Sequence, residues 1–144
     1  MVEKIATILD TKGHGIYSVP LEATAHEAIS LMAEKTVGAV LVLDEGSLEG
    51  IVSAKDYGSR VVLRGRSARE TPVREIMSSP VVTVADNATV FECMAIMTKN
   101  HIRHLPVVRD TELVGVVSMG DLANAVIADQ AFKIDQLMTY VGHH

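Results

Sequence analysis

The sequence contains a long internal repeat, which constrains its fold more than any other feature. Segment 18–64 aligns with segment 83–129 without a gap, and the apolar positions stay in phase. Identical pairs include Val19/Val84, Ala23/Ala88, Thr24/Thr89, Glu27/Glu92, Met32/Met97, Leu48/Leu113, Gly50/Gly115, Ser53/Ser118 and Asp56/Asp121. A match of this kind indicates two copies of one supersecondary unit, each too small to bury a good core alone.

Each copy has the same order of local signals. A short extended segment ends near Val19 or Val84, and a Thr followed three residues later by a Glu then gives the spacing of a capping box. Apolar residues at helical spacing follow. Two β-branched runs, 39–43 and 105–108, predict buried strands, and a second strand leads to Gly-x-x-Ser in each copy. Helices are expected to start near residues 54 and 119, the second reaching about residue 140, so each unit is β-α-β-β-α.

Composition limits the class of protein. The chain has 144 residues, of which 48% are hydrophobic, so a packed core is expected. A net charge of −5 argues against a nucleic-acid surface, although one arginine cluster exists (Arg60, Arg64, Arg66, Arg69), interpreted as a solvated helix end and linker. The single Cys93 is expected to be a buried thiol in a reducing compartment. Without a membrane-length apolar run or a recognisable signal peptide, a soluble cytoplasmic protein is expected.

The two units resemble a known family. Both end in Gly, two apolar residues, Ser and then Asp three positions on (GIVSAKD at 50–56, GVVSMGD at 115–121), and the phrase HIRHLPVV at 101–108 is very similar to that family's strand entry. The chain is similar to a tandem pair of cystathionine-β-synthase (CBS) domains, often called a Bateman module, and to the stand-alone members of the family. The resemblance implies repeat 1 at 10–66, a linker at 67–76 and repeat 2 at 77–137. The implied α/β (α+β) fold packs the two repeats sheet to sheet about a pseudo-two-fold axis.

The repeated Ser and Asp have two interpretations. An Asp in the first turn of a helix stays ionised near the positive end of the helix dipole, where its carboxylate is suited to accept from the hydroxyls of a ribose. The Ser hydroxyl lies at the end of the strand, and the amides of the helix N-terminus suit a phosphate. The same spacing is also a helix-capping pattern, which favours a purely structural role. The residues alone leave both interpretations open.

The resemblance implies two clefts that bind adenosine nucleotides, each built from both repeats. Cleft A would use Ser118 and Asp121 for ribose, Gly13, Tyr17, Gly38 and Ala39 for adenine, and Arg103 and His104 for phosphate. Cleft B would use Ser53 and Asp56 with Ser78, Val82, Arg103 and His104, and Lys55 or Arg60 for phosphate. Cleft A is the better candidate, because Gly38 and Ala39 stand where Arg103 and His104 stand in the other repeat.

The remaining histidines give weaker signals. A lone His beside a strand, such as His104, is commonly a structural residue, and Arg103 next to it favours a ligand contact. His14, His101 and His104 lack the spacing of metal ligands, so no metal is expected. His26 is expected on an exposed helix face. His143 and His144 end the chain, and a purification-tag remnant is one interpretation of them.

Three functions remain after these arguments. No P-loop, Rossmann fingerprint, C-x-x-C pair or nucleophile elbow occurs, so the chain is not expected to be an enzyme. The leading hypothesis is a sensor of AMP, ADP, ATP or NAD that passes its ligand state to a partner protein. The resemblance implies a homodimer, a disc of four repeats, with the apolar C-terminal helix at the interface. The alternatives are a ligand-free scaffold whose Ser/Asp pairs only cap helices and, least favoured by the charge, a nucleic-acid-binding module.

Overall fold

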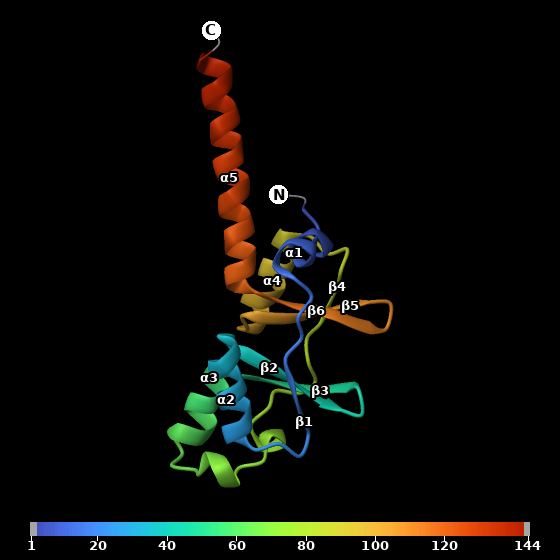
Figure 1. Cartoon of the computed structure of the whole chain (residues 1–144), viewed down its shortest axis with the longest axis vertical. Helices are drawn as coiled ribbons and strands as arrows, with labels where there is room; N and C mark the ends of the chain where they lie inside the picture. The colour runs from blue at the N-terminus through green and yellow to red at the C-terminus, as the bar shows by residue number, and fades with distance from the viewer. Residues whose placement is uncertain (1–2, 143–144) are drawn as a thin grey trace. The chain divides into compact units, whose positions relative to one another are not determined.

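The computed structural model describes residues 3–142, which fall into two compact units (Figure 1). The first-repeat unit comprises residues 16–82, and the second-repeat unit comprises residues 83–142 together with the N-terminal segment 3–15. Each unit contains one three-stranded sheet with helices, so the expected mixed α+β fold is confirmed. The boundaries of repeat 1, the linker and repeat 2 stay a prediction. The two compact units are defined by packing and do not test where each repeat begins or ends in the sequence.

The first-repeat unit follows the predicted β-α-β-β-α order. Its sheet has the order β1-β2-β3, with β1 parallel to β2 and β2 antiparallel to β3. A π-helical turn at 58–62 continues α3, and two short 3-10 turns follow at 68–70 and 73–75. The elements are β1 (Ser18–Pro20), α2 (Ala25–Lys35), β2 (Ala39–Asp44), β3 (Ser47–Ser53) and α3 (Ala54–Tyr57).

The second-repeat unit repeats this topology in the order β4-β5-β6. The Thr89 hydroxyl accepts from the Glu92 amide at 3.1 Å, so the predicted cap begins α4 as expected. The last helix is far longer than its counterpart α3. The elements are β4 (Val84–Ala85), α4 (Val90–Asn100), β5 (His104–Arg109), β6 (Glu112–Ser118) and α5 (Met119–Gly142).

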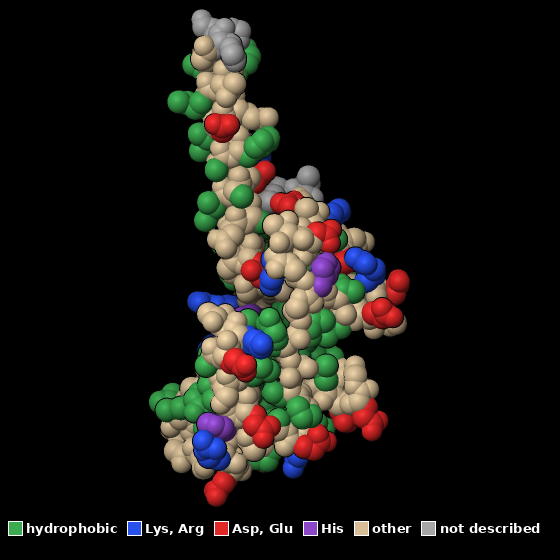
Figure 2. Space-filling view, viewed as in Figure 1, with side chains coloured by type: hydrophobic (Ala, Val, Ile, Leu, Met, Phe, Trp, Pro, Cys, Tyr) green, Lys and Arg blue, Asp and Glu red, His purple; other side chains and the backbone are tan. Residues whose placement is uncertain are grey.

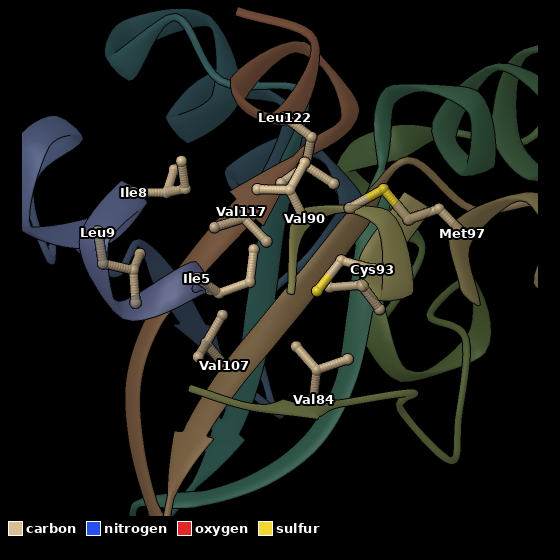
Figure 3. Close-up of a cluster of buried hydrophobic side chains, with 11 residues drawn as sticks. Ile5, Ile8, Leu9, Val84, Val90, Cys93, Met97, Val107, Val117 and Leu122 are labelled. Atoms are coloured by element: carbon tan, nitrogen blue, oxygen red, sulfur yellow. The ribbon is translucent and has the colours of Figure 1, made fainter. Parts of the chain in front are cut away.

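A helix that the sequence analysis did not predict, α1 (Ile5–Lys12), completes the second-repeat unit. Ile5 and Leu9 are fully buried, and their side chains lie among those of α4, β5 and β6 (Figure 3). Backbone bonds from the amide of Ile5 to the carbonyl of Ala88, 2.8 Å, and from the amide of Ala6 to that of Asp86, 2.9 Å, fix its start. The N-terminal segment is therefore part of the core that supports the second Ser/Asp motif.

Candidate functional site

The Ser53/Asp56 motif forms a complete capping box at the junction of β3 and α3. The amide of Asp56 donates to the Ser53 hydroxyl at 3.1 Å, and the amide of Ser53 donates to Oδ2 of Asp56 at 2.8 Å. The Ser53 hydroxyl itself donates to the same Oδ2 at 3.0 Å. Ser53 and Asp56 therefore do cap the start of the helix, and these bonds hold both side chains where strand meets helix.

The Ser118/Asp121 motif has the same geometry where β6 meets α5. The amide of Asp121 donates to the Ser118 hydroxyl at 3.1 Å, and the amide of Ser118 donates to Oδ2 of Asp121 at 2.8 Å. Asp121 differs in its third partner, because the ammonium of Lys12, at the end of α1, donates to Oδ2 at 2.8 Å. Among residues 3–142, no hydrogen bond reaches Oδ1 of Asp121, which leaves that oxygen open as an acceptor.

The charge state of Asp121 follows from these partners. Partial burial works to raise the pKa of the carboxyl, and the hydrogen bonds from Lys12 and the Ser118 backbone outweigh it. The net effect lowers the pKa of Asp121 below its ordinary value, so the carboxylate is ionised at neutral pH. An ionised carboxylate with one free oxygen is a strong acceptor for a hydroxyl donor.

The strand entry of each repeat lies directly beside its own Ser/Asp motif. In register, His104 of β5 faces Ser118 of β6, and Ala39 of β2 faces Ser53 of β3. The amide of Met119 donates to the carbonyl of Arg103 at 2.8 Å, and its counterpart Ala54 donates to Gly38 at 3.0 Å. Arg103 and His104 therefore lie beside the second motif within one unit.

His104 and Arg103 differ in environment. His104 is half-buried, and burial is the main cause that lowers the pKa of its imidazole; the charges of Lys12 and Arg103 add to this, while Asp121 opposes it. The ring is therefore neutral near pH 7, so it can act as a hydrogen-bonding group but does not carry a positive charge. Arg103 is exposed, and together with Lys12 it gives this corner its positive charge.

The other residues predicted for the clefts lie as follows. Arg60 donates to the carbonyls of Ile76 and Met77 at 2.8 and 3.1 Å and lies 3.9 Å from Oδ1 of Asp56, so its guanidinium is largely engaged. Lys55 is exposed. Tyr17 is partly exposed, with the ammonium of Lys35 5.7 Å from its ring centroid.

The remaining predicted residues lie at strand edges and loop ends. Ser78 exchanges two backbone hydrogen bonds with Ile51 of β3, and Val82 is partly exposed at the end of the first-repeat unit. Gly13 ends α1 with a φ of 105°, a conformation that favours glycine. Both clefts draw on residues of both units, so each cleft as a whole stays a prediction.

Neither a metal site nor a helix able to cross a bilayer occurs within residues 3–142. Within residues 3–142, no group of three or more His, Cys, Asp or Glu side chains has an arrangement that would hold a metal ion. No helix in that range combines the length and apolar character needed to cross a bilayer. His143 and His144 lie outside the described residues.

Sequence reasoning missed one residue of this site, Lys12. The signal for its helix was present, because Ile5, Ile8 and Leu9 have the i, i+3, i+4 spacing of a helix that buries one face. Its contact with Asp121 spans most of the chain, so no local pattern pointed to it.

Comparisons with known proteins agree with this architecture. A model of the CBS domain matches residues 9–57 and 73–128. The mitochondrial CBS domain-containing protein CBSX3 of Arabidopsis thaliana is 34% identical over 123 residues, which cover 82% of this chain and 60% of CBSX3. The chain thus spans less than two thirds of that relative. YhcV of Bacillus subtilis is 35% identical over 119 residues, covering 83% of this chain and 84% of YhcV.

The solved structures lead to the same family. The structure of a protein with CBS domains from Burkholderia ambifaria is 44% identical, covers 89% of this chain and 96% of its own, and superimposes with a TM-score of 0.86. Its likeness extends across both repeats, as does the match of the family model. The duplicated sheet-and-helix unit with its terminal Ser and Asp is therefore a pair of CBS domains, and the chain belongs to the CBS domain family.

Proposed function

We propose that this chain is a regulatory module that binds an adenine nucleotide and passes its ligand state to a partner protein. CBS domain pairs are known generally as regulatory modules, and the nucleotide is the more specific part of the proposal. The observation that carries it is the Asp121 carboxylate, which is ionised, is held by two hydrogen-bond donors (the Ser118 amide and the Lys12 ammonium) and retains one open oxygen.

The surroundings of Asp121 suit the rest of a nucleotide. Arg103 supplies an exposed positive charge and His104 a neutral ring on the strand entry beside Ser118. A guanidinium recognises phosphate oxygens through paired donors. A ribose acceptor and a phosphate donor within one corner of the second-repeat unit are the two polar requirements of a nucleoside phosphate. The family resemblance supplies the choice of adenine as the base.

A ligand-free scaffold is the second candidate, and the completeness of the caps favours it. Both Ser/Asp pairs satisfy helix-start amides without any ligand, so helix capping alone accounts for their presence. The open oxygen of Asp121 is the feature that capping does not require. Changing this oxygen while keeping the cap therefore separates the two functions.

The test is thermal melting with AMP, ATP, NAD and S-adenosylmethionine. A ligand at 100 times its Kd adds about 2.7 kcal/mol to the stability of a protein, a rise in Tm of roughly 5–11 °C for a chain of this size. Asp121→Asn retains an oxygen that accepts from Ser118 and places an amide NH2 where Oδ1 was. The proposal predicts that this variant loses most of the ligand-induced shift, and that a double variant with Asp56→Asn loses all of it.

The matched control is Thr89→Ala, which removes a cap of the same chemistry from α4. Loss of a cap costs about 1 kcal/mol, so this variant melts earlier but keeps the full ligand-induced shift. If no nucleotide raises the Tm of the wild type, and the Asp variants lose only the stability expected from a lost cap, the ligand-free scaffold is the correct function.

The regulatory proposal includes self-association of two copies through α5. Seven large apolar side chains beyond its first two turns are between 59% and 69% exposed, and hydrophobic side chains line this part of the helix in Figure 2. They are Ile127, Phe132, Ile134, Leu137, Met138, Tyr140 and Val141. Ile127, Ile134 and Val141 recur every seventh residue, which is the repeat of a two-helix seam.

The exposed area suits a second copy of the same helix. Seven large side chains that are two-thirds exposed present on the order of 700 Å² on each chain. Pairing two copies would thus bury on the order of 1,000 Å² in total, which reaches the size of a specific interface. Sedimentation equilibrium is expected to give a dimer for the wild type and for Gln136→Lys, and a monomer for Ile134→Lys. A monomeric wild type, or an Ile134→Lys variant that stays dimeric, would contradict this interface.

A further inference from the structure

The two Ser/Asp motifs differ in a neighbouring residue: Lys12 contacts the Ser118/Asp121 motif. The alignment that pairs Ser53 with Ser118 pairs Met77 with Lys12. Met77 packs over Gly50 of β3, while Lys12 donates to Asp121 and, also at 2.8 Å, to the carbonyl of Val116 in β6. The duplicated motif therefore has a lysine beside it in only one of its two copies.

The edge strands show why a lysine fits there. In the first-repeat unit, the carbonyl of Ile51 accepts from the backbone amide of Ser78 at 2.9 Å. The corresponding carbonyl in β6, that of Val116, accepts from the side chain of Lys12. Lys12 thus takes the place of a backbone donor along the edge strand, and its ammonium is fixed next to the motif carboxylate at a side-chain exposure of 35%.

Counting donors and acceptors defines what this pair offers. An ammonium has three N–H donors. Two of those of Lys12 are used, by Val116 and by Oδ2 of Asp121. Among residues 3–142, the third N–H of Lys12 and Oδ1 of Asp121 have no hydrogen bond, so one donor and one acceptor lie open side by side. Two neighbouring hydroxyls match such a pair, since one can accept while the other donates.

We propose that Lys12 is a ligand-contacting residue that makes the Ser118/Asp121 site selective for an intact ribose cis-diol. Its free N–H donates to one hydroxyl oxygen of the ribose, and the neighbouring hydroxyl donates to Oδ1 of Asp121. This inference rests on the proposed nucleotide binding and adds to it the basis of sugar selectivity. A site built to hydrogen-bond a hydroxyl discriminates strongly against an analogue that lacks it, because the polar groups that the ligand covers are then left unpaired.

The competing interpretation is that Lys12, the last residue of α1, forms a purely structural ion pair with Asp121 and does not contact a ligand. An ion pair that is one-third exposed contributes little to stability, so Lys12→Met is expected to fold. Lys12→Met also gives the second motif the residue that the first motif has at this position. The two interpretations differ in one measurable quantity, the ratio of affinities for ribose and deoxyribose ligands.

The experiment is calorimetric titration of the full chain with AMP, 2′-deoxy-AMP and 3′-deoxy-AMP. AMP is the probe because it is the part that ATP, ADP and NAD have in common. Wild type is expected to bind AMP at least about 10-fold more tightly than it binds at least one of the two deoxy analogues. This ratio is the one expected when a hydrogen bond to a charged group is lost. Lys12→Met is expected to bind AMP roughly 10-fold more weakly and to lose most of this discrimination.

The matched control is Arg66→Met, which removes an ion pair to Glu75 in the first-repeat unit whose cationic side chain is as exposed as that of Lys12. It is expected to keep both the affinity for AMP and the discrimination. If Lys12→Met keeps the wild-type affinity ratio while wild type discriminates, the role of Lys12 is overturned and nucleotide binding stands. If wild type binds AMP and both deoxy analogues equally, selectivity for the diol is overturned. If wild type binds none of them, the proposed function fails and this inference with it.

Discussion

Gly115→Ala tests whether the close contact between β6 and α1 holds the second motif in place. A Cβ added at Gly115 would lie 2.7 Å from Cδ2 and 3.0 Å from Cδ1 of Leu9. Leu9 is fully buried in the core of the second-repeat unit, so its side chain has no free space to enter. Either Leu9 takes a strained rotamer or α1 shifts, and with it Lys12.

The magnitude follows from two opposing effects. Overpacking of this kind costs about 1–3 kcal/mol. Replacing a glycine within a strand returns about 0.5–1 kcal/mol. Gly115→Ala is therefore expected to lower the free energy of unfolding by about 1–2 kcal/mol, because the collision is with a buried side chain.

Gly50→Ala is the matched comparison at the corresponding position of β3. Its added Cβ would collide with Sδ of Met77 and would also meet Cγ at 2.7 Å and Cβ at 3.0 Å, and Met77 is a flexible, half-buried side chain. We expect a loss of less than about 1 kcal/mol there. Urea unfolding, with the midpoint and slope fitted for each variant, measures both losses. A Gly115→Ala variant as stable as wild type, or less affected than Gly50→Ala, would refute the packing argument.

Three further predictions concern titratable groups. The lowered pKa of His104 means that the stability from its neutral form is complete above pH 6.5 and lost as pH falls through the folded value; an NMR titration midpoint at or above 6.5 would contradict this. The lowered pKa of Asp121 gives stability that is complete above pH 3.8 and lost below it, so Asp121→Asn should flatten the acid limb of unfolding. Burial, with a smaller effect of Glu92, raises the pKa of Cys93 to about 11, so a thiol reagent at pH 8 should react only as fast as the protein opens.

The sequence predicted most of the fold because its signals are local. The Thr89 cap, the β-branched runs and the Gly-x-x-Ser strand ends each act over a few residues, and the repeat shows each signal twice. Helix α1 was missed although the spacing of its apolar residues is also a local signal. It is short, it has no copy in the aligned repeat, and its cap residue Lys4 makes no side-chain hydrogen bond to it.

The candidate site was predictable only in part. The capping role of Ser53 and Asp56 was visible in their spacing, and the structure confirms it. Lys12 was not visible as a neighbour of Asp121, and Arg60 was named as a candidate phosphate contact without any sign of the carbonyls that engage it, because both sets of contacts depend on tertiary packing. Lys12 reaches Asp121 from the other end of the chain, and Arg60 is drawn to the carbonyls of a distant loop.

The two motifs share the backbone hydrogen bonds of the cap, so under the proposed function any difference between the two sites arises from the residues around them. The backbone amide of Ser53 or Ser118 meets the carboxylate at 2.8 Å, and that of Asp56 or Asp121 meets the hydroxyl at 3.1 Å. A capping box sets these distances locally, so they do not distinguish one ligand from another. Selectivity therefore has to come from positions at which the repeats differ. Two such positions flank the carboxylates: Lys12 against Met77, and Arg60 against Ala125. A third is the strand entry, where Arg103 and His104 replace an uncharged pair. The duplication thus preserved a common carboxylate, and under the proposed function its neighbours are the residues that would give each site a different ligand preference.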